Sequence, residues 1–363
     1  TWSAPAETAA PPRPYARPMT IPVSLRHATL VIAAAAAGVG APLAAQGGVD
    51  ARLRAFAAEV DSLRVAHRIP GLSLAVVRDG RVVLARGYGF ADLEARVAAT
   101  EHTPYPIASV TKPIAGVTAL RLVERGVLDL DRPMSSYANW AEFCADVRAE
   151  GPRIFFADYD CSPRVTLRHV LSMQMNGTAG ERFRYNPISF SWASRPIMQA
   201  TRRAFSDLVA EEVFGPAGMT ESARQHRDLP LRADLAARLA LPYRWDSAGA
   251  FVRSPGPDAQ GDGAAGGVIS TVADMARFDM ALDEGRLLPD ARKAEMWRAG
   301  RSPSGAVLPY GIGWYVQEVD GRRVVWHGGW WEQAYSALYL KLPDERLTLI
   351  LLANSEGALL PNK

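Results

Sequence analysis

Strand-like sequence lies at both ends of the chain, and helix-like sequence fills its middle. Near the start, residues 72–77 and 82–88 are apolar runs joined by Asp79-Gly80, a dipeptide typical of a tight hairpin. Near the end, four short apolar or alternating runs are separated by turn dipeptides; they cover residues 312–319, 323–327, 334–340 and 347–353. This order predicts an α+β fold, with one sheet built from both chain ends and an all-helical lobe inserted between them.

Helical patterns flank the expected strands and set the lobe boundaries. Residues 49–68 have amphipathic spacing that predicts a helix ending before Pro70-Gly71, and a second helix is expected over residues 271–282. We expect a sheet lobe and a helical lobe that together make one domain. The sheet lobe comprises residues 46–99 and 262–363, and the helical lobe comprises residues 100–261.

The first 45 residues have the composition of a segment removed before the protein works. Residues 19–45 begin at Met19 with a short basic stretch, continue as an apolar run and end in small residues. This is the pattern of a signal peptide, and its apolar run is too short to span a bilayer comfortably. We expect residues 1–18, which are rich in Pro and Ala, to be a disordered upstream segment. The mature protein is expected to be exported, periplasmic or secreted.

Charge and cysteine content exclude several classes of partner. The net charge is only +3 over 363 residues, so the sequence predicts no nucleic-acid partner and no stable membrane anchor. Cys144 and Cys161 are the two cysteines, and in an exported protein they form either one disulfide or two free thiols. Their spacing and the scattered histidines match no metal site, so neither a metal nor another cofactor is predicted.

The segment 106–116 reads as the start of a helix that carries a hydroxyl and an amine. Ser109 and Lys112 are three residues apart, which places both side chains on one face of a helix. Only four of the 41 basic residues are lysines, and burial lowers the pKa of a lysine readily, whereas arginine keeps its proton. Lys112 is therefore a candidate base for Ser109. Taken alone, the same spacing also fits a capped helix with a solvated lysine.

Several motifs in a fixed order give the chain a family resemblance. The motifs are residues 69–77, 107–112, 128–133, 165–172, 265–271 and 326–329. The chain resembles the serine β-lactamase and penicillin-binding-protein superfamily, in the branch of AmpC-like β-lactamases, D-alanyl peptidases and family VIII carboxylesterases. The resemblance implies an antiparallel sheet flanked by helices and an acyl-enzyme on Ser109, with Lys112 sharing the proton transfer.

The resemblance also implies a catalytic tyrosine, for which the sequence offers two candidates. Tyr137-Ala138-Asn139 spells the family motif literally, but it lies only 28 residues after Ser109. Tyr185 lies 76 residues after Ser109, after the 165–172 segment, as the family order requires. We therefore favour Tyr185, and expect a nearby Lys112 ammonium to favour its ionised form.

The residues after Tyr185 depart from the family pattern. Relatives place an asparagine two residues after the tyrosine, where it contacts a substrate amide, but this chain has Pro187 there. Asn186 is the nearest residue able to take over that contact, so it is a candidate substrate-binding residue.

A third motif, His327-Gly328-Gly329, ends an expected strand. Glycines let a substrate approach a strand edge closely, so all three residues are candidate substrate-binding residues. The resemblance implies that the backbone N–H groups of Trp330 and Ser109 form an oxyanion hole. Trp331 is a candidate for an aromatic wall beside the substrate. Alone, the motif also fits a glycine turn with an exposed histidine.

These residues favour one substrate class and leave others open. A neutral histidine is a weak anchor for the carboxylate of β-lactams and D-alanyl peptides, and Pro187 has no polar side chain. We therefore expect a carboxylesterase that acts on short-chain esters. The alternatives are a β-lactamase, a D-alanyl carboxypeptidase or D-aminopeptidase, and a non-catalytic binding protein. The expected partner is a small ester, amide or β-lactam, and the oligomeric state stays open.

The end of the chain also differs from the family pattern. Only nine residues follow Asn354, whereas relatives usually close with a helix packed on the sheet. Residues 358–361 are too short to replace that helix, so we expect a truncated C-terminus.

Overall fold

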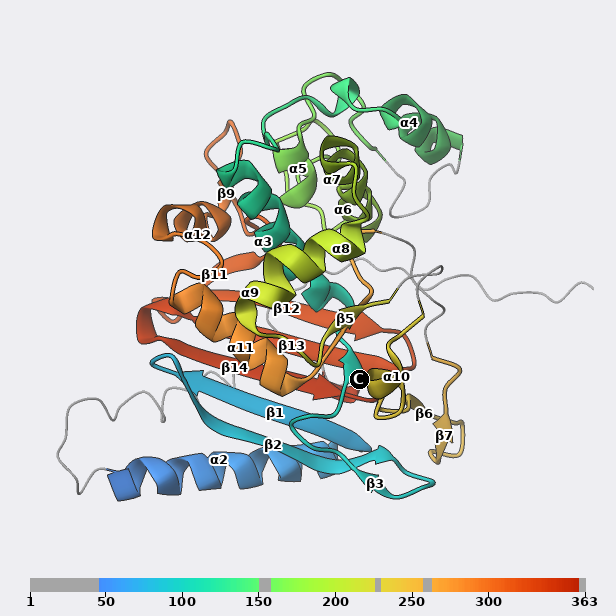
Figure 1. Cartoon of the computed structure of the whole chain (residues 1–363), viewed down its shortest axis with the longest axis vertical. Coiled ribbons are helices and arrows are strands. Elements are labelled where there is room, and N and C mark those ends of the chain that lie inside the picture. The colour runs from blue at the N-terminus through green and yellow to red at the C-terminus, as the bar shows by residue number, and fades with distance from the viewer. Residues whose placement is uncertain (1–45, 150–157, 226–229, 257–262, 359–363) are drawn as a thin grey trace, which may run out of the picture.

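A computed structural model describes residues 46–149, 158–225, 230–256 and 263–358 (Figure 1). The expected upstream segment and signal peptide, residues 1–45, lie outside the described residues. Residues 359–363 also lie outside the described residues. Part of the expectation of a truncated C-terminus rests on them.

A seven-stranded antiparallel sheet joins the two ends of the chain, as the sequence predicts. Its strand order is β11-β12-β13-β14-β1-β2-β3, and β1 pairs with β14 from Leu72↔Ala353 to Arg78↔Leu347. The strands are β1 (Gly71–Arg78), β2 (Arg81–Asp92), β3 (Val97–Ala98), β11 (Tyr315–Val319), β12 (Arg322–Trp331), β13 (Tyr335–Leu342) and β14 (Leu347–Ala353). N-terminal and C-terminal segments are therefore neighbours in the middle of one sheet.

Two hairpin turns explain why these strands pair in this register. Asp79 and Gly80 have φ of 50° and 72°, and Asp320 and Gly321 have φ of 51° and 73°. Positive φ at both central residues is the type I′ geometry, whose twist matches that of the flanking strands. Asp-Gly suits this turn because glycine has no Cβ and aspartate tolerates the left-handed region.

Helices cover the sheet and build the second lobe (Figure 1). Helix α2 (Gln46–Ala66) runs beside β2, and α11 (Val272–Asp283) packs against β1 and β14. The other α-helices are α3 (Thr111–Glu124), α4 (Trp140–Ala149), α5 (Leu167–Leu171), α6 (Pro187–Trp192), α7 (Ser194–Thr201), α8 (Phe205–Val209), α9 (Gly215–Ala217), α10 (Ala233–Ala236) and α12 (Asp290–Met296). Short 3₁₀ turns are η2 (Ala108–Val110), η3 (Met134–Ser136), η5 (Pro343–Glu345) and η6 (Glu356–Ala358). A π-helical segment, η4 (Ala210–Phe214), connects α8 to α9.

The inserted lobe is not purely helical, which corrects the sequence prediction. Within residues 100–261 lie β4 (Tyr105–Pro106), β5 (Ala223–Arg224) and the hairpin of β6 (Tyr243–Trp245) with β7 (Phe251–Arg253). Strands β4 and β5 flank β8 (Val268–Ser270) in a small sheet that ties the two lobes together. These strands are two or three residues long, too short to show a period-2 pattern. A further pair, β9 (Gly300–Arg301) and β10 (Val307–Leu308), follows α12.

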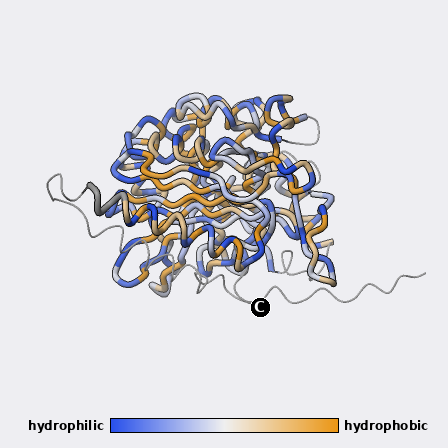
Figure 2. The backbone as a smooth tube through the Cα atoms, turned by 90° about the horizontal axis from the view of Figure 1, so that it is seen from below, coloured by the Kyte–Doolittle hydropathy of each residue, from blue (hydrophilic) through white to orange (hydrophobic). Residues whose placement is uncertain are grey.

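The hydrophobic residues gather in the sheet, between the helices. Figure 2 shows the strands as an apolar band with helices above and below it.

Cys144 of α4 and Cys161 form a disulfide, so the first of the two sequence alternatives for these cysteines is correct. Among the described residues, no helix combines the length and the apolarity needed to cross a bilayer.

Candidate active site

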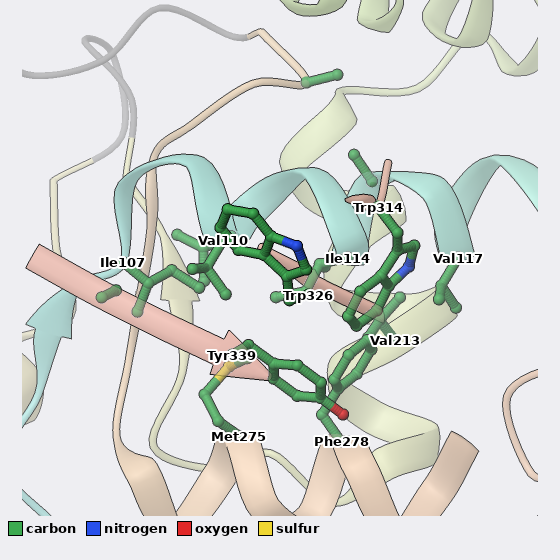
Figure 3. Close-up of a cluster of buried hydrophobic side chains, with 14 of the residues drawn as sticks. Ile107, Val110, Ile114, Val117, Val213, Met275, Phe278, Trp314, Trp326 and Tyr339 are labelled. Carbon is green, nitrogen blue, oxygen red and sulfur yellow. The ribbon is translucent and has the colours of Figure 1, made fainter. Parts of the chain in front are cut away.

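Ser109 lies in the single turn η2, which leads directly into the buried helix α3. The residue before it, Ala108, has φ of +46°, an uncommon conformation for a residue with a Cβ. Such strain persists only where the surroundings hold it, and here the apolar side chains of Ile107, Val110 and Ile114 anchor the segment. Figure 3 shows them packed among side chains of the sheet and α11; those labelled include Trp326, Tyr339, Met275 and Phe278. The core thus fixes the position of the hydroxyl.

The structure brings Ser109, Lys112 and Tyr185 together. Lys112 Nζ lies 2.7 Å from Ser109 Oγ, as their spacing on one helical face requires. The Tyr185 hydroxyl donates to the same Oγ over 2.8 Å, across 76 residues of sequence. Lys112 Nζ also donates to the carbonyl of Ala265 over 3.1 Å. The expected nucleophile thus lies within hydrogen-bond reach of the two groups expected to transfer its proton.

Burial controls the charge state of this cluster. Lys112 is fully buried, and desolvation holds its pKa well below the usual value of 10.5. Desolvation raises the pKa of Tyr185, and the hydrogen bond with Ser109 only partly opposes that effect. The expectation of an ionised phenol beside an ammonium is therefore wrong. The lysine is itself driven toward its neutral form, so it supplies little charge to stabilise a phenolate.

The second candidate tyrosine, Tyr137, lies in a different environment. Its ring is buried beneath the guanidinium of Arg132, whose Cζ is 4.6 Å from the ring centroid. Tyr185, and not Tyr137, forms the hydrogen bond with Ser109. The choice made from motif order is the one that the geometry supports.

The end of strand β12 faces the Ser109 turn. Strand β11 pairs with β12 only up to Tyr315↔Trp326, whereas β13 follows β12 as far as Trp331. Residues 327–331 of β12 therefore have one edge not paired with β11. A Cβ at Gly329 would lie 2.1 Å from the carbonyl oxygen of Ile107, so only glycine lets β12 approach the nucleophile segment this closely.

Comparison with known proteins agrees with this geometry. The family model described as beta-lactamase matches residues 49–361. The chain belongs to this family. It is a serine hydrolase of the beta-lactamase and penicillin-binding-protein group.

Individual relatives of the family are distant. Penicillin-binding protein 4* of Bacillus subtilis is 26% identical over 82% of this chain and 70% of its own length. A D-aminopeptidase of Brucella ovis is 27% identical over 80% of this chain, which spans only 57% of that enzyme. The octameric penicillin-binding protein homologue from Pyrococcus abyssi superposes with a TM-score of 0.68 at 21% identity, over 85% of this chain and 74% of that one. The last likeness shows the shared fold.

Within this family site, His327 is not placed to touch a substrate through its side chain. The imidazole is fully buried, with Nε2 2.8 Å from the Tyr310 hydroxyl and Nδ1 2.7 Å from the Gly328 carbonyl. The sequence prediction of a substrate-binding imidazole is therefore corrected. Desolvation holds the pKa of His327 well below its usual value, and a proton on the nearby Lys112 would lower it further. The imidazole is neutral at physiological pH.

Asn186 is also a structural residue in this arrangement, which corrects its prediction as a substrate contact. Its side chain is buried and caps α6 by accepting from the Ser189 N–H over 3.1 Å. The same oxygen accepts from the Tyr159 hydroxyl over 3.0 Å, and the amide nitrogen donates to Asn176. Pro187 then takes the first helical position, where a missing N–H is harmless. This cap fixes the residue directly after Tyr185.

The two tryptophans after the glycines lie at the strand end. Trp330 is 37% exposed, and its indole N–H donates to Glu356 over 3.1 Å, while Trp331 is partly buried. The role of Trp331 as an aromatic wall stays a prediction. So does the role of the backbone N–H groups of Trp330 and Ser109 as an oxyanion hole. Among the described residues, no group of three or more His, Cys, Asp and Glu side chains is arranged to hold a metal.

Sequence reasoning missed two tyrosines beside the site. Tyr310 bonds to His327, and the ring of Tyr315 stacks on that of Tyr185 with centroids 6.0 Å apart. Both are buried. A cluster of aromatic residues and glycines at 310–315 was the available signal, but it reads equally well as plain core.

Proposed function

We propose that this serine hydrolase is a carboxylesterase that forms an acyl-enzyme on Ser109, with short-chain esters as substrates. The observation that carries the proposal is the convergence of Lys112 Nζ and the Tyr185 hydroxyl on Ser109 Oγ. A hydroxyl becomes an effective nucleophile when an adjacent base takes its proton.

The neutral forms of Lys112 and Tyr185 support one direction of proton transfer. A neutral Lys112 amine has two N–H groups and one lone pair, and one N–H is used by the Ala265 carbonyl. Its lone pair then accepts the Ser109 proton as Oγ attacks the ester carbonyl. Tyr185, un-ionised because of its burial, donates its proton to the departing alkoxide and is re-protonated from Lys112. The two groups titrate as a coupled pair.

Two features support an uncharged substrate. His327 is neutral and buried, so it does not present a positive charge to a carboxylate. Pro187 lies at the start of α6, where family members carry an amide side chain. Esters without a nearby carboxylate fit both features, whereas β-lactams and D-alanyl peptides carry that carboxylate.

A second candidate is the hydrolysis of amides of D-amino acids. The similarity to a D-aminopeptidase, 27% identical, favours it, and such a substrate can also be free of a carboxylate at the scissile bond. The acyl-enzyme chemistry would be the same, and only the leaving group would differ.

The test has two parts. Incubation with a fluorophosphonate, followed by peptide mass spectrometry, should place the adduct on Ser109 and not on a Ser109→Ala variant. A panel of p-nitrophenyl esters, nitrocefin, a D-amino acid p-nitroanilide and a D-Ala-D-Ala peptide should show highest kcat/KM for the short esters. Higher values for the anilide would favour the amidase alternative. Activity unaffected by Ser109→Ala would reject the mechanism.

We also propose that the protein is exported. The Cys144–Cys161 disulfide supports this, because such bonds persist in oxidising compartments. Expression with its leader, followed by fractionation and thiol labelling, should recover an oxidised protein outside the cytoplasm. Recovery of a reduced protein in the cytoplasm would contradict the proposal.

A further inference from the structure

The imidazole of His327 is enclosed by three tyrosine rings. The ring centroids of Tyr185, Tyr310 and Tyr315 lie 6.0, 5.9 and 5.4 Å from that of His327. These tyrosines and Lys112 of α3 are the titratable groups that face the imidazole, and Tyr339 is its register partner on β13. Lys112 is the one amine among them.

The hydrogen bonds of His327 determine which ring nitrogen carries the proton. Nδ1 lies 2.7 Å from the Gly328 carbonyl oxygen, which can only accept, so Nδ1 carries the hydrogen. In a neutral ring Nε2 is then the acceptor. The Tyr310 hydroxyl, 2.8 Å away, must therefore be the donor to Nε2.

Tyr310 is itself held in place. Its ring stacks on Phe183 with centroids 5.6 Å apart and meets Tyr315 edge-on at 4.9 Å. Its backbone N–H donates to the Leu308 carbonyl, and the side chain is fully buried. A proton added to Nε2 would face the hydroxyl hydrogen of Tyr310, so the hydroxyl must turn and accept before the imidazole can become charged. Its own hydrogen would then point into the aromatic cluster, where the described residues offer it no other acceptor.

We propose that Tyr310 is a specificity-determining residue, whose hydroxyl holds the buried His327 in one uncharged tautomer. No positive charge at His327 then attracts a substrate carboxylate from behind the site, and the site selects acyl compounds whose leaving group is uncharged. This inference rests on the proposed function and names the residue that sets its substrate class. Tyr310 acts through His327 and is a positioning residue, without a part in the proton transfers at Ser109.

The test uses two thioesters that differ only in charge. S-acetyl mercaptoacetamide and S-acetyl mercaptoacetate transfer the same acetyl group to Ser109 Oγ as the C–S bond breaks, and the released thiol is measured colorimetrically. For the wild-type protein we expect kcat/KM for the carboxamide to exceed that for the carboxylate about tenfold, with a ratio constant from about pH 5 to 8.

The variants separate a specific role from a structural one. In Tyr310→Phe, Nε2 loses its donor and can take a proton, so the ratio should fall several-fold as the pH decreases. Tyr315→Phe is the matched control, because within the described chain the Tyr315 hydroxyl has no hydrogen-bond partner and its removal should leave the ratio unchanged. His327→Lys should shift the ratio at least tenfold toward the carboxylate.

Two results would overturn the inference alone: a wild-type protein that prefers the carboxylate, or a Tyr310→Phe ratio that follows the wild type at every pH. Circular dichroism establishes that each variant is folded, and the Tyr310→Phe comparison decides the question if His327→Lys does not fold. Hydrolysis of neither thioester would instead contradict the proposed function, and the inference with it.

Discussion

Lys341 Nζ lies 3.0 Å from Asp279 Oδ1, and both side chains are only 1% exposed. The same carboxylate oxygen accepts from the hydroxyls of Tyr339 and Thr348, and Lys341 also lies 2.8 Å from Asp283. This network joins α11 to β13 and β14. Burial raises the pKa of Asp279 even though Lys341 opposes that shift.

Removal of the lysine should therefore destabilise the fold. Lys341→Met leaves a buried carboxylate without its cation, and the free energy of unfolding should fall by about 3–5 kcal/mol in urea denaturation. Arg323→Met is the control: its ion pair with Asp344 is exposed, and its loss should cost about 0–1 kcal/mol. Equal losses of unfolding free energy in the two variants would contradict the larger contribution predicted for the buried network.

Lys112 should be irreplaceable by arginine. Lys112→Met removes the base, and Lys112→Arg supplies a group that keeps its proton, so kcat/KM for p-nitrophenyl acetate should fall about 10²–10⁴-fold in both. Stopped assays on folded protein measure this effect. An arginine variant with near wild-type activity would show that positive charge, and not a lone pair, is what Ser109 needs.

The pH profile should report a lysine titrating far below its usual range. Because desolvation lowers the pKa of Lys112, the amine is a base above that lowered pKa and is protonated below it. Activity should be present at neutral pH and decline as the pH falls through the apparent pKa of the coupled pair. Measurement of kcat/KM from pH 4 to 10 tests this. A profile that rises only near the ordinary lysine pKa would disagree.

The two tyrosines of the sequence analysis should behave differently. Tyr185→Phe removes the hydroxyl that donates to Ser109 Oγ, so kcat should fall about 10²-fold or more with the fold retained. Tyr137→Phe removes a hydroxyl outside this cluster and should leave kcat within a factor of two or so. The reverse ranking would reassign the catalytic tyrosine.

Gly329 should tolerate no side chain. Its Cβ would lie 2.1 Å from the backbone carbonyl of Ile107, so Gly329→Ala must separate β12 from the Ser109 turn. A displacement of about 1 Å can cost about 10²-fold in rate. Gly215→Ala is the control, since its nearest neighbour would lie 3.4 Å away. Comparable kcat/KM for the two variants would mean that this close approach does not matter for the reaction.

The parts of the fold that depend on local sequence patterns could be predicted from the sequence. The Asp79-Gly80 hairpin, the strands on each side of it and the C-terminal strands follow from local turn chemistry and hydrophobic spacing. The pairing of Ser109 with Lys112 is also local, because one helical turn brings them together. Tyr185 was placed by motif order, and not by any physical signal in its own surroundings.

The properties that depend on the neighbourhood of each side chain could be determined only from the tertiary structure. The sequence by itself specified the elements, the hydroxyl and the amine. Only the folded chain decided that β1 lies beside β14, that Asn186 caps a helix and that His327 is enclosed by tyrosines. It also decided that Lys112 and Tyr185 are driven toward neutrality. Desolvation is the reason, because the loss of water around a group depends on atoms from many distant segments at once.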